Sequence, residues 1–502
     1  MRHERILAFD VGTSGVKAVV TDASGHILQS ASRGYGLTTG EGGEVDQDLD
    51  EILAASQSAT RELIDGLSGG PGAIAAVSVT AQMFNLVAVD RSGRALLPML
   101  SWLDQRAEPE ARSLSARMPA DEQYARLGAV VSGKDILPKI LWLRDRRPEV
   151  YRATAKLLDC KEAVVMSLTG RATIDHAGAS AYRLFDQQAR QWDRAVCREL
   201  GIAEELLPEV MPATAIAGEI TDAMARQTGL LAGTPVVVGA GDVPASQIGA
   251  GAVGIGDAHI SLGTAVYFGV TLGQPTPDPE RRLGVLAHMD PNAWILWLEI
   301  ATGGGALAWL ERTIGAFGGR EPIDHDDVDR LVARCADEME GLLFAPWLSG
   351  ERVPVFDDRA RAAFVGIGLN HGRAHLLRAV MEGVAFQMRW ALEYGLAFGQ
   401  PLTELRAVGG GTIGEIWIQI IADVLDRPIR VIRQPQDAAA VGAAACALVA
   451  LHLQPSFDFA RELAIVEREY LPDPRHRAEY AARYGQFRSL YDALFPIYHP
   501  AG

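Results

Sequence analysis

Four glycine-rich turns, each at the end of a short apolar run, contain the residues of this sequence that could carry out chemistry. The first is Asp10-Val-Gly-Thr-Ser-Gly-Val-Lys17. Glycine permits unusual backbone angles, so the N–H groups around Gly12 could point at an anion. Thr13 and Ser14 would add hydroxyl groups, and Lys17 would add a positive charge. The segment predicts either a phosphate-binding turn or a plain hairpin with a solvated lysine.

Asp242 lies in the second turn, Gly239-Ala-Gly-Asp242, directly after the apolar run at residues 236–238. A carboxylate in this place could accept a proton from a hydroxyl nucleophile or hold a metal ion. It could equally cap the next helix through an Asx turn. Asp10 has the same alternatives.

The other two turns are Ser261-Leu-Gly-Thr264 and Gly409-Gly-Gly-Thr412. Three consecutive glycines would let a flat ligand such as adenine approach the backbone, but they could also serve only helix–strand packing. Gln82-Met-Phe84 closes the apolar run that starts at Ile74, and its aromatic ring offers no acid–base chemistry.

Several common kinds of site are excluded by residue spacing. The chain has neither the Gly-x-x-x-x-Gly-Lys-Ser/Thr loop nor a strand–Gly-x-Gly-x-x-Gly–helix unit. The histidines and the four cysteines lack metal-ligand spacing, and no Ser/His/Asp or Cys/His arrangement can be assembled.

The elements that must position these turns alternate between apolar strands and longer helix-like stretches, which is typical of an α/β protein. Gly12 and Gly263 follow two such strands and are 251 residues apart, half of the 502-residue chain. This echo predicts duplicated halves that face each other across a cleft. We expect a first domain at residues 1–250 and a second at 251–502, with the boundary in the glycine-rich stretch 249–256.

Composition indicates a folded, soluble, cytoplasmic protein. The chain is 48% hydrophobic and 22% charged, and its net charge of −16 argues against nucleic-acid or anionic-membrane partners. The start of the chain leaves no room for a signal peptide. The 14-residue alanine-rich run at 438–451 is too short to span a bilayer and predicts a buried, closely packed helix.

In order along the chain, these motifs resemble the FGGY family of carbohydrate kinases, and especially its xylulose-kinase-like members. The resemblance runs from Ile6 to about Tyr491. Besides the four turns, it is carried by Trp102-Leu-Asp-Gln-Arg106, Leu348-Ser-Gly-Glu-Arg-Val-Pro354 and the C-terminal signature between Ala362 and Glu382. The N-terminal signature fits less well, because Ile136 stands where a small residue or proline is usual.

The resemblance implies two actin-like, ribonuclease-H-like domains with ATP and sugar meeting in the cleft between them. It implies that Asp242 is the catalytic base and that Asp10 holds Mg²⁺. The residues it assigns to ATP are Gly12, Thr13, Ser14, Lys17, Gly263, Thr264, Gly304, Gly410 and Gly411. Those it assigns to the sugar, besides Asp242, are Gln82, Met83, Phe84, Trp102, Asp104 and Val243.

The sugar site is where the chain departs from the family. Xylulose kinases usually have histidine at the place of Phe84 and a polar amide at the place of Val243, and Leu103 replaces a common asparagine. Losing hydrogen-bonding groups usually changes which hydroxyl pattern a site selects. We therefore expect a substrate with an apolar edge, such as a deoxy sugar or a shorter polyol. Alternatively, Asp104, Lys134 or Asp175 compensates and xylulose is still used.

The leading interpretation is an ATP- and Mg²⁺-dependent kinase acting on a small-molecule sugar or polyol, with no nucleic-acid or membrane partner and a homodimer as the candidate assembly. Two alternatives keep the same fold: a catalytically silent sugar or nucleotide sensor, and an actin-type ATPase. The retained Asp242 and phosphate turns argue against the sensor.

Overall fold

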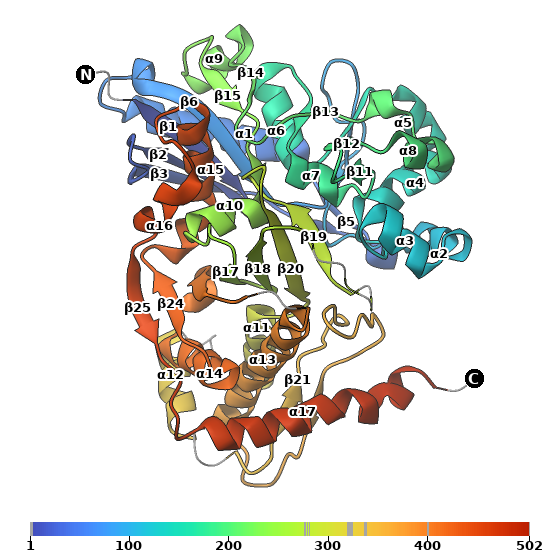
Figure 1. Cartoon of the computed structure of the whole chain (residues 1–502), viewed down its shortest axis with the longest axis vertical. Coiled ribbons are helices and arrows are strands. Elements are labelled where there is room, and N and C mark those ends of the chain that lie inside the picture. Colours follow the sequence, from blue (N-terminus) through green and yellow to red (C-terminus); the bar gives the residue numbers. More distant parts are fainter. Residues whose placement is uncertain are drawn as a thin grey trace. The chain divides into compact units, whose positions relative to one another are not determined.

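The computed structural model describes residues 4–275, 278, 280, 282–318, 325–335, 339–398 and 401–500, which form two compact units (Figure 1). The first unit consists of Met1–Val253, Val285–Ile295 and Asp437–Leu463. The second consists of Gly254–Gly284, Leu296–Gln436 and Ala464–Gly502. The first long segment ends close to the expected boundary at residue 250, and two later segments return to the same unit.

The first unit is built on a mixed sheet. Its strand order is β14-β15-β6-β1-β2-β3, with β16 beside β6. The strands are β1 (Arg5–Val11), β2 (Gly15–Thr21), β3 (Ile27–Gly34), β6 (Ile74–Ala81), β14 (Ile216–Glu219), β15 (Pro235–Val237) and β16 (Ala240–Gly241). Strands β1, β2 and β3 are antiparallel neighbours, whereas β6 runs parallel to both β1 and β15.

Helices cover both faces of this sheet because successive strand side chains point to opposite sides. On β1, Leu7 and Phe9 enter a core that also contains residues of α1 (Leu49–Asp65) and α6 (Cys160–Thr169). Ile6 and Ala8 enter a second core formed with α15 (Ala438–Ala450). This double cover explains the nearly unbroken apolar sequence of β6.

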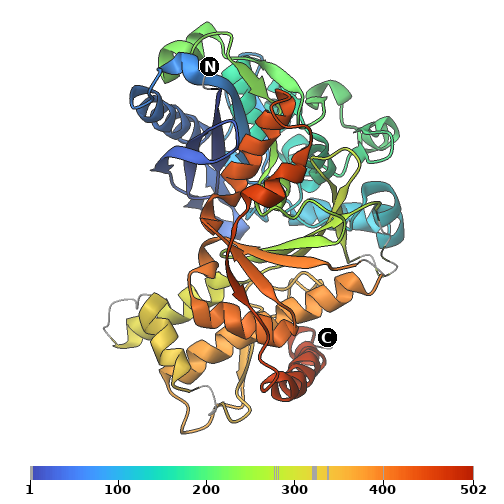
Figure 2. The same ribbon diagram turned by 60° about the vertical axis from the view of Figure 1, so that its left-hand side comes forward.

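Helix α15 is the buried, closely packed helix predicted from the alanine-rich run, and it crosses β1 and β6 (Figures 1 and 2). It also packs on α10 (Asp242–Gly249) at backbone distance. A Cβ atom on Gly442 would lie 1.9 Å from the Ala245 carbonyl oxygen, and one on Gly249 would lie 1.7 Å from that of Ala438. Glycine is therefore required on each helix for this contact.

A second sheet repeats the same plan, and all of its strands except β19 (Gly284–Ala287) lie wholly or mostly in the second unit. Its order is β19-β20-β18-β17-β23-β24-β25, in which β17 and β18 form an antiparallel hairpin and β17, β23 and β24 are parallel neighbours. The strands are β17 (Asp257–Leu262), β18 (Val266–Leu272), β19 (Gly284–Ala287), β20 (Trp294–Ile300), β23 (Glu404–Val408), β24 (Ile429–Ile432) and β25 (Val466–Tyr470). A hairpin followed by parallel partners thus opens each unit, as the Gly12/Gly263 echo predicts.

The remaining helices complete the two units. Those of the first are α2 (Glu108–Arg117), α3 (Ala120–Leu127), α4 (Ile136–Arg146), α5 (Pro148–Ala153), α7 (His176–Ala181), α8 (Arg194–Leu200), α9 (Asp222–Thr228) and α16 (Ala460–Leu463). Those of the second are α11 (Gly304–Gly318), α12 (His325–Ala333), α13 (Arg373–Leu396), α14 (Glu415–Leu425) and α17 (Arg477–Tyr498).

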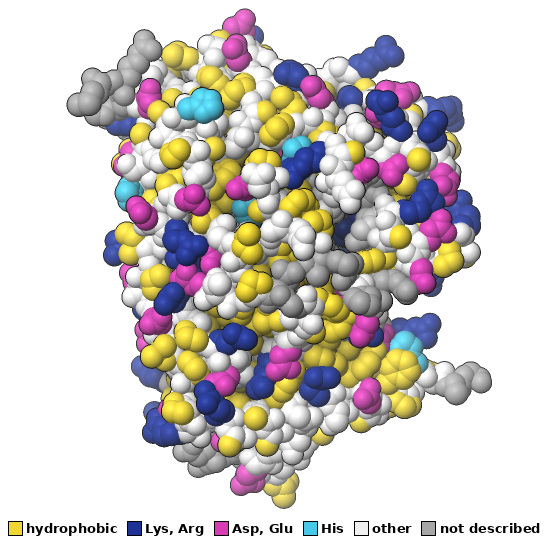
Figure 3. Space-filling model, viewed as in Figure 1, with side chains coloured by type: hydrophobic (Ala, Val, Ile, Leu, Met, Phe, Trp, Pro, Cys, Tyr) yellow, Lys and Arg dark blue, Asp and Glu magenta, His cyan; other side chains and the backbone are white. Residues whose placement is uncertain are grey.

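Two further findings concern the whole described chain. Among the described residues, none of the helices combines the length and the apolar character needed to cross a membrane. On the face seen in Figure 3, basic and acidic side chains are interspersed.

Candidate active site

The turn between β1 and β2 is closed and anchored through the chain's own hydrogen bonds. The Gly12 N–H donates to the Gly15 carbonyl at 2.9 Å. The Thr13 hydroxyl accepts from the Trp102 indole at 3.0 Å, and the Thr13 carbonyl accepts from the Gln47 amide at 2.8 Å. The turn is therefore held in one conformation, and Trp102, assigned to the sugar, contacts Thr13, assigned to phosphate.

Lys17 and Asp10 lie opposite each other in the β1–β2 register. Burial raises the pKa of Asp10 to about 6, although the positive charge of Lys17 opposes this shift. The Lys17 ammonium group forms an ion pair with Asp437, which directly precedes α15. Lys17 is thus a partly buried, paired cation and not the solvated residue of a plain hairpin.

Asp242 is the first residue of α10, directly after β16. Because β16 pairs with β6 at Gly241 and Ala81, Asp242 lies beside the segment that follows β6. Burial, followed by the negative charge of Asp10, raises the pKa of Asp242 to about 7. Its Oδ1 atom accepts from the Val243 N–H at 2.9 Å. A carboxyl group that titrates near neutrality can exchange a proton with a hydroxyl group.

Gln82, Met83 and Phe84 form the segment that follows β6. The Gln82 N–H donates to the Val11 carbonyl at 2.8 Å, which continues the β1–β6 pairing. Met83 packs against Gly241, where an added Cβ would lie 2.3 Å from its Cγ and Sδ atoms. The structure therefore brings this segment next to Asp242.

Phe84 has a left-handed backbone, with φ at 66°. This conformation is uncommon for a bulky residue and persists only where the surroundings enforce it. Here the Phe84 N–H donates to Asp159 at 2.8 Å, and the Phe84 carbonyl accepts from the Lys139 ammonium group at 2.8 Å. Two buried charged side chains thus hold the backbone of Phe84 in place.

Asp104 and Val243 are less available than the sequence suggested. Asp104 is fully buried, and its carboxylate accepts from the Val45 N–H at 2.7 Å and from the Arg106 backbone and side chain at 3.0 and 2.8 Å. Val243 is 4% exposed. Asp104 therefore acts within the chain as an anchor for the loop that carries Trp102.

Four residues outside the predicted set form hydrogen bonds to Phe84, Trp102 and Thr13: Asp159, Asn85, Lys139 and Gln47. Burial and the charge of Glu162 raise the pKa of Asp159 to about 7. Asp159 directly follows β9 (Lys156–Leu158), so the pattern of a strand ending in an acid could have identified it. Lys139 belongs to the part of the N-terminal family signature that fits, whereas Asn85 and Gln47 carry no such signal.

In the second unit, the remaining nucleotide-site candidates come together at one end of β17 and β23. The Gly263 N–H closes its turn on the Ala265 carbonyl at 3.1 Å, and the Gly304 N–H donates to the Gly263 carbonyl at 2.9 Å. A Cβ on Gly411 would lie 3.0 Å from that of Leu262, whereas one on Gly410 would meet no atom within 4 Å. Gly304 and Gly411 therefore serve close packing, and Gly410 presents open backbone.

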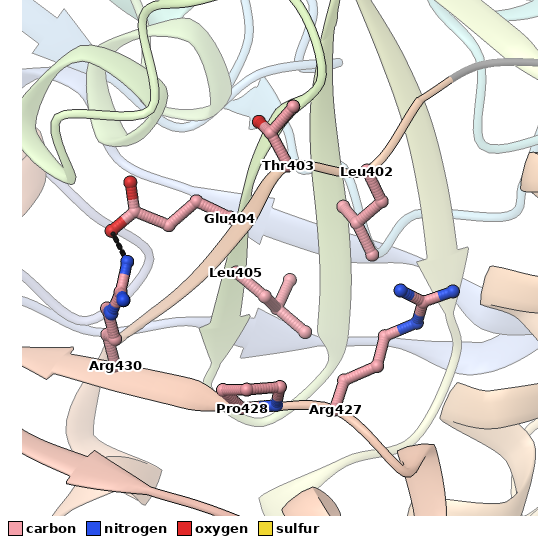
Figure 4. A pocket seen from close by; sticks show the side chains of 7 residues that line it. All are labelled: Leu402, Thr403, Glu404, Leu405, Arg427, Pro428 and Arg430. Carbon is pink, nitrogen blue, oxygen red and sulfur yellow. Dashed lines mark hydrogen bonds and ion pairs between the residues drawn. The ribbon is translucent and has the colours of Figure 1, made fainter.

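A cavity of about 100 Å³ lies at the other end of β23 (Figure 4). Its lining residues are Leu402, Thr403, Glu404, Leu405, Arg427, Pro428 and Arg430. Glu404 pairs with Arg430 at 2.8 Å on one side of it. None of the residues predicted from the sequence lines this cavity.

Within the described part of the chain, no cluster of three or more acidic, histidine or cysteine side chains could hold a metal ion. All four cysteines are buried free thiols. Asp10 nevertheless fits Mg²⁺, which is usually bound by one or two carboxylates together with substrate phosphates and water. Burial disfavours the ionised form of the Asp10 carboxyl and so raises its pKa, and a bound cation would stabilise that ionised form.

Comparison with known proteins agrees with this fold. Residues 5–249 match the N-terminal domain, and residues 258–451 the C-terminal domain, of the FGGY family of carbohydrate kinases. A gluconokinase of Bacillus subtilis strain 168 is 27% identical over 91% of this chain and 90% of its own length. A xylulose kinase of Escherichia coli strain K12 is 28% identical over 98% of this chain and 99% of its own.

Among solved structures, a ligand-bound xylulose kinase from Lactobacillus acidophilus superposes with a TM-score of 0.90 at 26% identity, over 99% of both chains. The family matches cover more than half of the chain, and both units have the ribonuclease-H-like sheet plan expected of actin-like domains. The chain therefore belongs to the FGGY family of carbohydrate kinases.

Proposed function

We propose that this kinase transfers the γ-phosphoryl group of ATP to a hydroxyl group of a sugar or polyol, with Asp242 as the general base. The observation that carries the proposal is the buried carboxyl of Asp242, with a pKa of about 7, beside the Gln82–Phe84 segment. As the oxygen–phosphorus bond forms, the hydroxyl proton passes to Asp242 and ADP leaves.

The raised pKa suits this role. A carboxylate with the ordinary pKa of 3.8 is a weak base at neutral pH, whereas one near 7 is about half ionised there and basic enough to accept a proton. A positioned base contributes roughly 10²–10⁴-fold to such a reaction. The rest of the rate enhancement in phosphoryl transfer comes from positioning and from neutralising charge on the phosphate oxygens.

For ATP, we propose the turns at Gly12–Ser14 and Gly263–Thr264 as phosphate-binding groups, with Gly304, Gly410 and Gly411 near the nucleotide base. In support, no group among the described residues accepts the Thr13 or Ser14 N–H. Asp10 would hold Mg²⁺, which when bound neutralises charge on the phosphates. Lys17 would exchange its Asp437 partner for phosphate oxygens.

The acceptor is proposed from the relatives' names and from the Phe84 segment. The curated relatives are a gluconokinase and a xylulose kinase, which suggests a small polyhydroxylated acceptor. The half-buried Phe84 side chain favours a substrate that presents an apolar edge to it. Of the three residues that could compensate, Asp104, Lys134 and Asp175, the first is bonded to Arg106 and the third pairs with Lys161.

The test is ATP consumption, with product detection by mass spectrometry, across ketoses, aldoses, polyols and their acids. We expect acceptor-dependent turnover in the wild type and a loss of about 10²-fold or more in Asp242→Asn. Asp222→Asn is a matched control, because Asp222 is also the first residue of a helix, α9, but is exposed. Turnover without any acceptor would favour an actin-type ATPase, and no turnover with any acceptor would favour a sensor.

A further inference from the structure

Arg183 lies against Phe84, one of the candidate sugar-site residues, and both residues have unusual backbones. The Arg183 guanidinium carbon lies 5.9 Å from the centre of the Phe84 ring. Their φ angles are 62° and 66°. Left-handed non-glycine residues are uncommon and cluster at binding and catalytic sites. Two of them in mutual contact therefore single out this place in the first unit.

The guanidinium group of Arg183 is buried without adequate hydrogen bonding. The residue is 5% exposed, and its Nε and Nη1 atoms are buried without a hydrogen-bond acceptor among the described residues. Its ion-pair partner is Asp135, whose Oδ1 lies 3.5 Å from Nε, beyond a normal hydrogen-bond length. Nearly all buried polar groups in proteins are hydrogen-bonded, so these donors call for an explanation.

The chain holds Arg183 and Phe84 in place from independent elements. Arg183 follows α7, and its N–H donates to the Ser180 carbonyl at 3.3 Å. Phe84 is held by Asp159 and Lys139, and its neighbour Met83 packs on Gly241, next to Asp242. The cation is therefore part of a rigid wall close to the proposed base.

We propose that Arg183 is a specificity residue that recognises a carboxylate on the substrate, so that the acceptor is a sugar acid and not a neutral sugar or polyol. A buried guanidinium donor without a partner forms its strongest hydrogen bond to an ionised acceptor such as a carboxylate oxygen. The carbon chain of the acid would lie against the Phe84 ring, which accounts for an apolar residue beside a buried cation. This inference rests on the proposed function and names its substrate class.

A monoanion suits the site better than a phosphate ester. Asp135 already faces Arg183, and Asp159 and Asp242 lie on the Phe84 side. The Lys139 ammonium group also lies here, but it is engaged by the Phe84 and Ser101 carbonyls. Arg183 is therefore the cation that can balance one additional negative charge, and the second charge of a dianion would have no such partner. We therefore exclude sugar phosphates as the preferred acceptor.

The test is a binding measurement on matched pairs that differ only in a carboxylate. Calorimetry without ATP compares erythronate with erythritol, xylonate with xylitol, and gluconate with sorbitol. We expect the wild type to bind the acid of at least one pair roughly 10- to 100-fold more tightly, since charge-assisted hydrogen bonds are the strong ones. Arg183→Gln should bind the acid and the polyol of that pair equally, and Arg183→Lys should retain part of the preference for the acid.

A control variant, and the comparison of binding with turnover, distinguish failure of this inference from failure of the proposed function. Arg126→Gln removes an arginine that pairs with Glu122 and Glu199 on the surface and should leave the acid-to-polyol ratio unchanged. Equal binding of acid and polyol by the wild type in all three pairs overturns the inference, whether or not the Arg183 variants fold. Because binding is measured without ATP, an acid preference without turnover would overturn the proposed function and leave the inference standing.

Discussion

Replacing Asp242 with asparagine should lower activity by about 10²-fold or more and at the same time stabilise the fold at alkaline pH. The pKa of Asp242 is raised from 3.8 to about 7, chiefly by burial. Because the folded chain binds this proton more tightly than the unfolded chain, stability is highest when the carboxyl is protonated. Stability then falls as the pH rises from about 4 to about 7, and it changes little above that.

The size of the effect follows from the shift. About three pKa units correspond to roughly 4 kcal/mol between the protonated and ionised forms. Asparagine is neutral at every pH and close in shape to the protonated acid. The free energy of unfolding of Asp242→Asn should therefore exceed that of the wild type by an amount that grows from near zero at pH 4 towards about 4 kcal/mol at pH 8.

Urea unfolding of both proteins at pH 5 and pH 8, with Asp222→Asn as the exposed control, measures this difference. A stabilisation of equal size at both pH values would show that packing and not ionisation is responsible. An asparagine variant less stable than the wild type at pH 8 would refute the claim that this carboxylate is held in an unfavourable environment. Stabilisation accompanied by full activity would refute its role as the base.

Three further variants test the surroundings of Asp242. Gly442→Ala places a Cβ 1.9 Å from the Ala245 carbonyl oxygen, so it should push α10 away from α15. The free energy of unfolding should fall by about 1–3 kcal/mol, and turnover should decrease. Unchanged unfolding and activity would contradict the backbone-to-backbone contact. Phe84→His should increase turnover of xylulose if the missing histidine is what disfavours it, and no gain would mean that selectivity lies elsewhere. Asp10→Asn should raise the Mg²⁺ concentration needed for half-maximal activity by 10-fold or more; an unchanged requirement would remove Asp10 from the metal site.

The sheet plan could be predicted from the sequence because local signals agree with it. The apolar run that leads into Asp10 corresponds to β1, and the one that starts at Ile74 corresponds to β6. The alanine-rich run became α15, because small residues are what a close helix contact needs. Periodicity and turn residues encode such features directly.

Long-range pairings could not be predicted in the same way. Lys17 and Asp437 are 420 positions apart and no sequence pattern joins them. The Asp104 carboxylate is fully hydrogen-bonded only because the folded chain brings the Val45 N–H and the Arg106 side chain to it. Likewise, the left-handed backbones of Phe84 and Arg183 are visible only in the structure, because nothing in a phenylalanine or an arginine requires them.

The choice of Asp242 as the base depends finally on hydrogen bonding, because Asp159 has a pKa raised to the same value of about 7. Both oxygens of Asp159 are engaged by the chain, one by the Phe84 N–H and the other by the Asn85 backbone and side chain and the Cys160 N–H. Among the described residues, Asp242 is bonded through Oδ1, and no donor reaches its Oδ2. A base needs an oxygen that can receive the substrate proton, and only Asp242 of these two has one. Asp159→Asn should therefore perturb the Phe84 segment and substrate affinity, whereas Asp242→Asn should act on the rate of phosphoryl transfer.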